Sequence, residues 1–193
     1  MPTTTAPFDT FKTFNTAPAS NPLAAQLQLV ARMIAARTTL GATRQVFFVS
    51  LGGFDTHDFL TAQHPGLLTN VANALKTFYD ATVALGVANN VTTFTASDFG
   101  RTLSSNGDGS DHGWGSHHFV LGGALQGQRF YGQAPAVAAG GPDDVGQGRL
   151  LPTTSVDQLA STLALWMGVP ASNLTTVAPN VGNFATANLG FLA

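Results

Sequence analysis

A continuous apolar run at residues 44–53, RQVFFVSLGG, limits the folds open to this chain more than any other segment. It is short and it ends on glycines, a pattern that suits a strand buried on both faces. Such a strand belongs in a sheet that carries helices on each side. The run therefore favours an α/β fold.

The segments around this run repeat the same alternation. Residues 21–41 have helical apolar spacing, with Asn21 as cap and Pro22 in the first turn, and residues 67–87 and 153–169 repeat it. Residues 89–100 read as a second strand and residues 117–132 as a strand or hairpin, while 100–115 and 132–152 read as loops. We therefore expect one α/β domain over residues 22–193, with helices on the faces of the sheet.

The composition of the chain limits the kinds of function that we expect. Only 9% of the residues are charged, the net charge is −2, and there are two lysines, so a nucleic-acid-binding surface is not expected. No apolar run approaches the roughly 18 residues of a membrane span. Without cysteine, disulfide and thiolate chemistry are excluded. Residues 1–21 are rich in Thr, Pro and Ala, lack the features of a signal peptide, and are expected to form a linker or extended arm.

All five histidines lie between His57 and His118, in the segments GGFDTHDF and GSDHGWGSHHF, and every acidic residue of the chain is an aspartate. Imidazole and carboxylate groups are common ligands of zinc and manganese. FDTH and SDFGR each follow a predicted strand, and ligands of α/β sheets collect beyond the carboxyl ends of the strands. We therefore predict a divalent metal site, whose candidate ligands are Asp55, His57, Asp98, Asp111, His112 and His117.

Each candidate has a structural alternative. Asp55 and His57 stand two apart, so in an extended segment they share a face, although Asp55 could instead cap the next helix. Asp98 ends the second predicted strand and could also be a helix cap. Arg101 is the candidate catalytic residue, as a clamp for an anionic substrate group, and its alternative role is to pair with Asp98.

The candidate residues between 111 and 118 also have structural alternatives. Asp111 and His112 are adjacent, so their side chains point to different sides, as two bridged metals would require. In a strand, at most one of His117 and His118 faces the site. We take Trp114 and His118 as candidate substrate-binding residues, although core packing is the commoner role of a tryptophan. A Ser–His–Asp triad is not favoured by any spacing.

Three motifs in order resemble the DUF1501 family, a bacterial family similar to the alkaline phosphatase-like superfamily of sulfatases and phosphomutases. The motifs are RQVFFVSLGGFDTHDF, TTFTASDFGRTLSSNGDGSDHGWGSHHFVLGG, and RLLPTTSVDQLASTLALWMGV followed by PNVGNF. The resemblance implies a three-layer α/β/α sandwich. It also implies one or two divalent ions (zinc, manganese or calcium) held by Asp and His, and a nucleophile. Asp98 matches a metal aspartate of the sulfatase pattern, but Phe99 stands where that pattern has a metal histidine.

The resemblance runs from about Pro22 to the end of the chain and corresponds to the carboxyl-terminal half of longer family members. It implies a periplasmic or exported protein, although no export signal is present in this chain. The half that carries the expected nucleophile is missing, so we expect an incomplete sheet. Exposed sheet edges of this kind could pair subunits into a homo-oligomer.

These observations predict a metal-dependent hydrolase of the phosphatase or sulfatase type. Its substrate would be a small-molecule or carbohydrate ester, attacked by metal-activated water with Arg101 stabilising the developing anion. The alternative is a non-catalytic, metal-stabilised protein for binding or surface assembly, which uses its Gly/Trp loop to hold a carbohydrate or partner. The missing nucleophile and Phe99 favour the alternative, and the dense Asp/His cluster favours the hydrolase. A metal-free structural domain is a third option.

Overall fold

The computed structural model describes residue 9 and residues 20–192. The chain divides into two compact units, residues 1–92 with 107–109, and residues 93–106 with 110–193. Each unit has its own cluster of buried apolar side chains. Most of residues 1–21, the expected linker or arm, lie outside the described residues.

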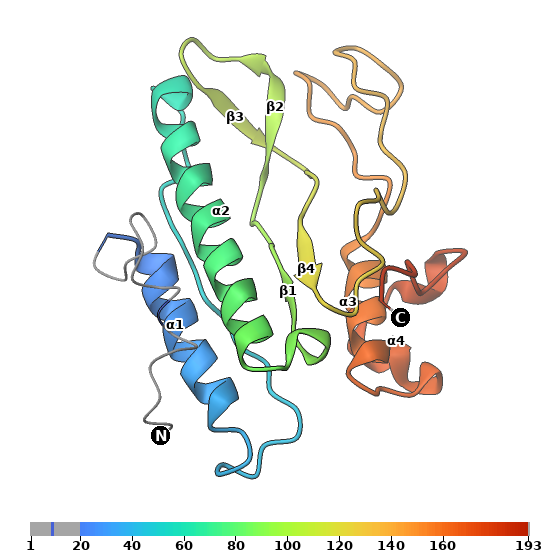
Figure 1. Ribbon diagram of the computed structural model, residues 1–193. Coiled ribbons are helices and arrows are strands. Elements are labelled where there is room, and N and C mark those ends of the chain that lie inside the picture. Colours follow the sequence, from blue (N-terminus) through green and yellow to red (C-terminus); the bar gives the residue numbers. More distant parts are fainter. Residues whose placement is uncertain (1–8, 10–19, 193) are drawn as a thin grey trace. The chain divides into compact units, whose positions relative to one another are not determined.

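The first unit is built on two long helices, α1 (Pro22–Ala35) and α2 (Leu60–Ala84), which lie side by side in Figure 1. The apolar spacing predicted for the first helix is confirmed. Its stripe packs against one face of α2, and these contacts exclude water from the core of the unit. The buried stripe consists of Leu23, Leu27, Val30 and Ile34, and the facing residues of α2 are Ala74, Phe78 and Ala81.

The predicted cap of α1 is also confirmed. The Asn21 side chain accepts hydrogen bonds from the backbone N–H groups of Leu23 and Ala24, at 3.1 and 3.2 Å. Its amide nitrogen donates to the carbonyl of Asn70 on α2, at 2.8 Å. Asn21 is fully buried, so one side chain both starts the first helix and joins it to the second.

The helix α2 begins at Leu60, several residues before the predicted start at Leu67. Its extra first turns contain the polar residues Gln63 and His64 and the proline Pro65, which carry no apolar spacing. The N–H of Leu60 donates to the carbonyl of Asp108, at 3.0 Å, so a distant segment satisfies one of the first N–H groups of the helix. Sequence spacing could not predict such a contact.

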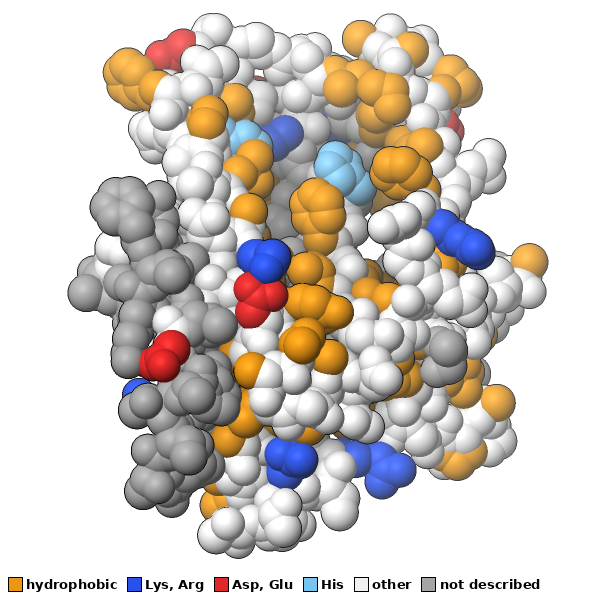
Figure 2. All heavy atoms as spheres, in the orientation of Figure 1, with side chains coloured by type: hydrophobic (Ala, Val, Ile, Leu, Met, Phe, Trp, Pro, Cys, Tyr) orange, Lys and Arg blue, Asp and Glu red, His pale blue; other side chains and the backbone are white. Residues whose placement is uncertain are grey.

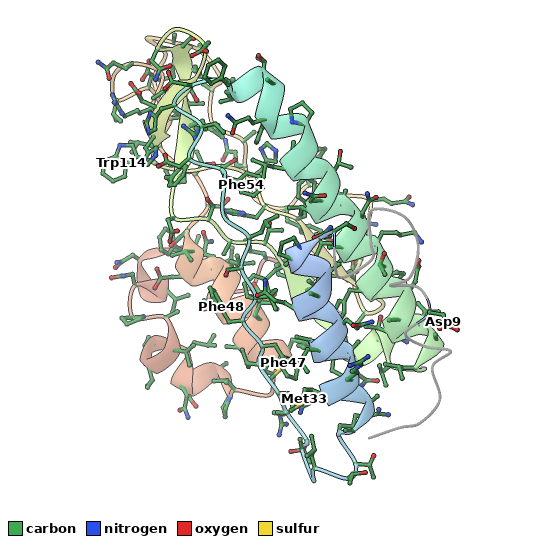
Figure 3. All side chains as sticks on the ribbon, turned by 90° about the vertical axis from the view of Figure 1, so that its left-hand side faces the viewer. Asp9, Met33, Phe47, Phe48, Phe54 and Trp114 are labelled. Atoms are coloured by element: carbon green, nitrogen blue, oxygen red, sulfur yellow. The ribbon has the colours of Figure 1, made fainter. Side chains whose placement is uncertain are left out.

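The prediction that residues 44–53 form a strand buried on both faces is wrong. The segment is extended, but no strand of the described residues pairs with it. Val49 and Leu51 pack against the helical core, whereas Val46 and Phe48 on the other face are 85% and 92% exposed. Figure 3 labels Phe47 and Phe48 on this segment. Helices cover one face only, and the side chain of Gln26 takes the place of a neighbouring strand by bonding both the N–H and the carbonyl of Ser50.

The second unit contains a β-hairpin where the sequence predicted a loop. Strand β2 (Gly100–Ser105) pairs antiparallel with β3 (Ser110–Gly113), and Arg101 lies opposite His112. The loop prediction over residues 100–115 is therefore wrong. Its basis was the Gly, Ser, Asn and Asp content, but glycine here permits close backbone packing, because a Cβ at Gly100 would overlap the carbonyl of Gly115.

The other strands of this region are shorter than predicted. Strand β1 (Thr92–Phe94) pairs with β4 (Val120–Gly122), so the strand predictions over 89–100 and 117–132 are confirmed for these residues alone. Residues 132–152 lack regular structure, apart from an isolated bridge between Asp144 and Leu150, as expected. A short 3₁₀ turn at Ala88–Asn90 precedes β1.

The predicted third helix is confirmed as α3 (Val156–Trp166), which begins at a capping box between Ser155 and Gln158. It packs against α4 (Leu174–Val177), and 3₁₀ turns at Ala171–Asn173 and Val181–Asn183 flank that short helix. The core of the second unit is small. It contains the buried residues Ala164, Leu174, Ala178 and Val181.

The mixed α/β class is thus confirmed. The sheets in the described part of the chain are two-stranded, and the three-layer sandwich stays a prediction. Because residues 44–53 join no described sheet, FDTH and SDFGR do not share the sheet edge that we expected. Among the described residues, no helix has the length and apolar character needed to cross a membrane.

Candidate metal-binding site

Asp55 and His57 form a close pair in the first unit. The carboxylate oxygen Oδ1 of Asp55 lies 3.1 Å from Nε2 of His57, and the side chains are 64% and 44% exposed. Thr56 between them is buried, so its neighbours turn to the same exposed side, as predicted for residues two apart. The proposed alternative for Asp55, a cap on the next helix, is wrong, since Phe59 is the cap residue of α2 and no side chain caps it.

The backbone beneath this pair is held by the tip of the hairpin. A Cβ at Gly109 would overlap the carbonyl of His57, so only glycine permits this approach. The carbonyl of the preceding residue, Asp108, accepts the N–H of Leu60. The tip residues 107–109 belong to the same compact unit as Asp55 and His57. The loop is therefore held from both sides, and a held loop gives its ligands less freedom to lose on binding an ion.

This donor pair fits a divalent cation. Zinc binds histidine nitrogen and aspartate oxygen at about 2.0–2.2 Å, so two ligands on one tetrahedral ion lie roughly 3.3 Å apart. The distance between Oδ1 of Asp55 and Nε2 of His57 is 3.1 Å. Both donor atoms can therefore face one ion with little change in the side chains. An ion held there would be open to water, since both side chains are exposed.

In the second unit, β3 carries Asp111 and His112 on opposite sides of the strand, as predicted for adjacent residues. The Asp111 carboxylate accepts a hydrogen bond from the Asn106 side chain at 3.0 Å, and its N–H donates to Thr102 Oγ1 at 3.2 Å. His112 is exposed, and its carbonyl accepts a hydrogen bond from Arg149 Nε at 3.2 Å. Asp111 thus bonds to neighbours on its own hairpin, and the His112 side chain lies on the other side of the strand.

Arg101 lies on β2 and is held by the hairpin itself. Its Nη1 donates to the carbonyl of Ser110 at 2.6 Å, and its guanidinium lies 5.2 Å from the centre of the Phe99 ring. Asp98 is exposed and precedes β2 rather than a helix, so the alternative of a helix cap at Asp98 is wrong. The roles of Arg101 as an anion clamp and of Asp98 as a ligand stay predictions.

His117 and His118 precede β4. His118 Nδ1 lies 3.3 Å from the Thr95 hydroxyl, and partial burial lowers the pKa of its imidazole, with a smaller lowering from the neighbouring His117. The His117 ring makes an edge contact with Phe119, 6.2 Å between centres. Trp114 is 67% exposed and is labelled in Figure 3, so the commoner role of core packing does not apply to it.

Sequence reasoning missed the residues that shape this region. Gly109 was read as part of a loop, although Asp-Gly between segments that can pair is a hairpin signal, and NGDGS at 106–110 contains one. That signal would have predicted the β2–β3 hairpin. It would not have predicted that the tip contacts His57, because no sequence spacing links residues this far apart.

The surface around these elements carries little charge. On the face shown in Figure 2, Lys and Arg side chains are few, and one of them lies against an acidic side chain. This agrees with the small net charge of the chain, −2. Basic side chains form no broad patch among the described residues of this face.

The chain is therefore a mixed α/β protein with a candidate Asp/His metal site. Residues 7–180 match the family described as "Protein of unknown function (DUF1501)", so the chain belongs to the DUF1501 family, as its motifs predicted. The match begins before Pro22, where the resemblance was expected to start. No curated protein and no solved structure shows significant similarity to the chain.

Proposed function

We propose that this protein is a metal-dependent hydrolase of the phosphatase or sulfatase type, and that Asp55 and His57 are the first ligands of its ion. The observation that carries the proposal is the separation of 3.1 Å between their donor atoms on an exposed, held loop. The pair joins a carboxylate with an imidazole, a combination common in catalytic zinc and manganese sites. Zinc, manganese and calcium are the candidate ions.

We propose His112 as the third ligand. Like Asp55 and His57, His112 is exposed, and its imidazole offers a nitrogen ligand. Three protein ligands leave a coordination position for water or substrate, as catalytic sites require. Asp98, Asp111 and His117 complete the predicted pool, and the Asp111 carboxylate already accepts a hydrogen bond from the Asn106 side chain.

A bound ion would activate water and polarise the ester. Arg101 would stabilise the anion that develops on the substrate, with guanidinium donors other than the Nη1 bond to the Ser110 carbonyl. Trp114, exposed on the loop after β3, would contact the leaving group, and His118 would bind substrate. We also propose that the chain belongs to the alkaline phosphatase-like superfamily and shares its three-layer sandwich. A periplasmic or exported location and a bacterial source are part of the same proposal.

Two observations favour the second candidate, a non-catalytic, metal-stabilised protein for binding or surface assembly. The exposed Trp114 and the 44% and 64% exposure of the pair suit a surface that holds a carbohydrate or another protein. A hydrolase gains by excluding water from its reacting groups, whereas a binding surface has no such requirement.

Hydrolysis of chromogenic esters separates the two candidates. We would assay p-nitrophenyl phosphate and sulfate with the purified chain, with the chain after chelation, and with the chelated chain after return of zinc, manganese or calcium. Variants H57A and H64A form a matched pair, because His64 lies on α2 in edge contact with Phe54, 6.0 Å between ring centres, and is not a proposed ligand.

The hydrolase proposal predicts turnover that chelation abolishes and one particular ion restores, in the wild type and in H64A but not in H57A. If no ester is cleaved, and chelation lowers only the melting temperature, the binding candidate is correct instead. If chelation changes neither property, both metal-based candidates are wrong.

A further inference from the structure

The His112 imidazole lies flat on the Phe99 ring. The ring centres are 3.7 Å apart and the planes differ by 3°. Arg101 also contacts this phenyl ring, with its guanidinium carbon 5.2 Å from the ring centre. All three residues belong to the second unit. The stack therefore involves a proposed metal ligand.

The hairpin backbone creates this stack. Gly100 pairs with Gly113 and Arg101 with His112, so Phe99 precedes the strand that lies beside His112. The absence of side chains at Gly100 and Gly113 allows the strands and the following chain to approach closely, since a Cβ at either position would press on backbone atoms. The Arg149 side chain fixes the His112 carbonyl from outside. The backbone of His112 and one face of its ring are therefore both held.

We propose that Phe99 is a positioning residue for His112, an inference that rests on the proposed function. A ring stacked through its face keeps both nitrogens at its edge, in the plane where a metal–nitrogen bond forms. Metal-binding histidines are commonly oriented by a hydrogen bond to the second ring nitrogen. Here the flat contact with Phe99 restricts the tilt of the ring.

A positioning role would account for Phe99, at which this sequence differs from the sulfatase pattern. Phe99 stands where the sulfatase pattern has a metal histidine, and a phenyl ring cannot bind the ion. In this chain the position would act through its neighbour instead. Loss of groups that orient metal ligands typically weakens metal binding by 10- to 100-fold. A contact without a hydrogen bond should lie at the lower end, so we expect about a 10-fold loss.

The test uses the full chain and the variants F99L, F99Y and F119L. F99L removes the ring and F99Y keeps it, while F119L removes an aromatic ring that contacts His117 instead. Two properties would be measured. The first is the proton shifts of the His112 ring in metal-free protein, assigned with H112A. The second is the zinc dissociation constant by calorimetric titration, together with the melting temperature of each variant.

The proposal predicts that the His112 ring protons are shifted upfield in the wild type and in F99Y, and return toward ordinary values in F99L. Zinc binding should weaken about 10-fold in F99L and stay within about 2-fold in F99Y and F119L. An unshifted His112 ring in the wild type would overturn the stack itself. Equal zinc affinity in the wild type and F99L would overturn the positioning role alone. If F99L does not fold, the wild-type shifts and the F99Y affinity still decide the matter, since weak binding by a well-stacked F99Y would contradict the proposal.

Failure of the proposed function would look different. A wild type that shows upfield His112 protons but binds no divalent ion would overturn the metal site, and with it any positioning role for Phe99. The shifts are measured without metal, so they remain an independent check on the geometry in that case.

Discussion

Gly109 shows how one residue without a side chain can determine the position of others that carry chemistry. Its Cα lies so close to the carbonyl of His57 that a methyl group would overlap backbone atoms. Backbone cannot rotate away as a flexible side chain can, so the loop or the hairpin tip would have to move. The candidate ligand His57 therefore depends on a glycine far from it in sequence.

We predict that G109A destabilises the chain by about 1–3 kcal/mol, the usual cost of overpacking, and weakens zinc binding. The matched control is G127A, because nothing lies within 4 Å of a Cβ at Gly127. Denaturant unfolding and calorimetric zinc titration would check both effects. Equal stability of the two variants would show that the hairpin tip does not rest on His57.

Asp144 organises the irregular loop of the second unit. Its carboxylate accepts hydrogen bonds from the N–H groups of Gly140, Gly146 and Gly148, at 2.7, 2.8 and 3.1 Å. These bonds favour the charged form, and the one from Gly140 contributes most to lowering the pKa of Asp144 below its usual 3.8. Such a carboxylate stabilises the folded loop above its unfolded pKa, and this is lost as pH falls through the lower folded value.

We therefore predict that D144N speeds amide hydrogen exchange at Gly146 and Gly148 at neutral pH. The difference from the wild type should shrink as pH falls below 3.8, because the carboxylate is then protonated in the opened loop and, at still lower pH, in the folded loop as well. D58N, at an exposed aspartate in the first unit, is the control. A difference between D144N and the wild type that stays constant from pH 7 to pH 3 would mean that the carboxylate charge is not what holds the loop.

At the scale of elements, the extended segment 44–53 shows that an apolar, strand-like sequence does not by itself determine which side chains are buried. Phe48 is 92% exposed, whereas Phe78 on α2 is 3% exposed in the core of the same unit. Both are phenylalanines in strongly apolar stretches, so hydrophobicity alone does not distinguish them.

We predict that F78A lowers the free energy of unfolding by about 3–5 kcal/mol, the usual cost of removing a buried phenylalanine. F48A should change it by no more than about 0.5 kcal/mol, as expected for an exposed side chain. Chemical denaturation of the two variants checks the pair. A large loss in F48A would restore the strand buried on both faces that the sequence predicted.

The difference between local signals and distant contacts explains which elements could be predicted from the sequence. The helices α1 and α3 follow from local signals, because Asn21 and Ser155 cap them and their apolar spacing lies within each helix. The neighbours of residues 44–53 are set by distant contacts, such as the Gln26 bonds to Ser50, which no local pattern encodes. The start of α2 depends likewise on Asp108.

The candidate site was predictable to a similar extent. Asp55 and His57 were found because a separation of two in an extended segment places both side chains on one face, and the structure confirms that arrangement. The opposite orientations of Asp111 and His112 also follow from local geometry. The Phe99 stack could not be predicted, since it depends on the register of a hairpin read as loop.

At the scale of the whole molecule, the chain combines membership of the DUF1501 family with a candidate metal site, and neither feature specifies a reaction. The DUF1501 match covers residues 7–180, and its description names no activity. The net charge of the chain is small, and basic groups form no broad patch among the described residues of the face in Figure 2. The claim on which both the hydrolase and the binding candidates depend is therefore that Asp55 and His57 hold a metal ion.

The most direct measurement of that claim is the metal content of the purified chain. The wild type, H57A and H64A would each be equilibrated with zinc, passed through a desalting column, and analysed by elemental mass spectrometry. We predict a stoichiometric amount of zinc in the wild type and in H64A, and a large loss in H57A. No retained zinc in the wild type, or equal zinc in H57A and H64A, would contradict the account.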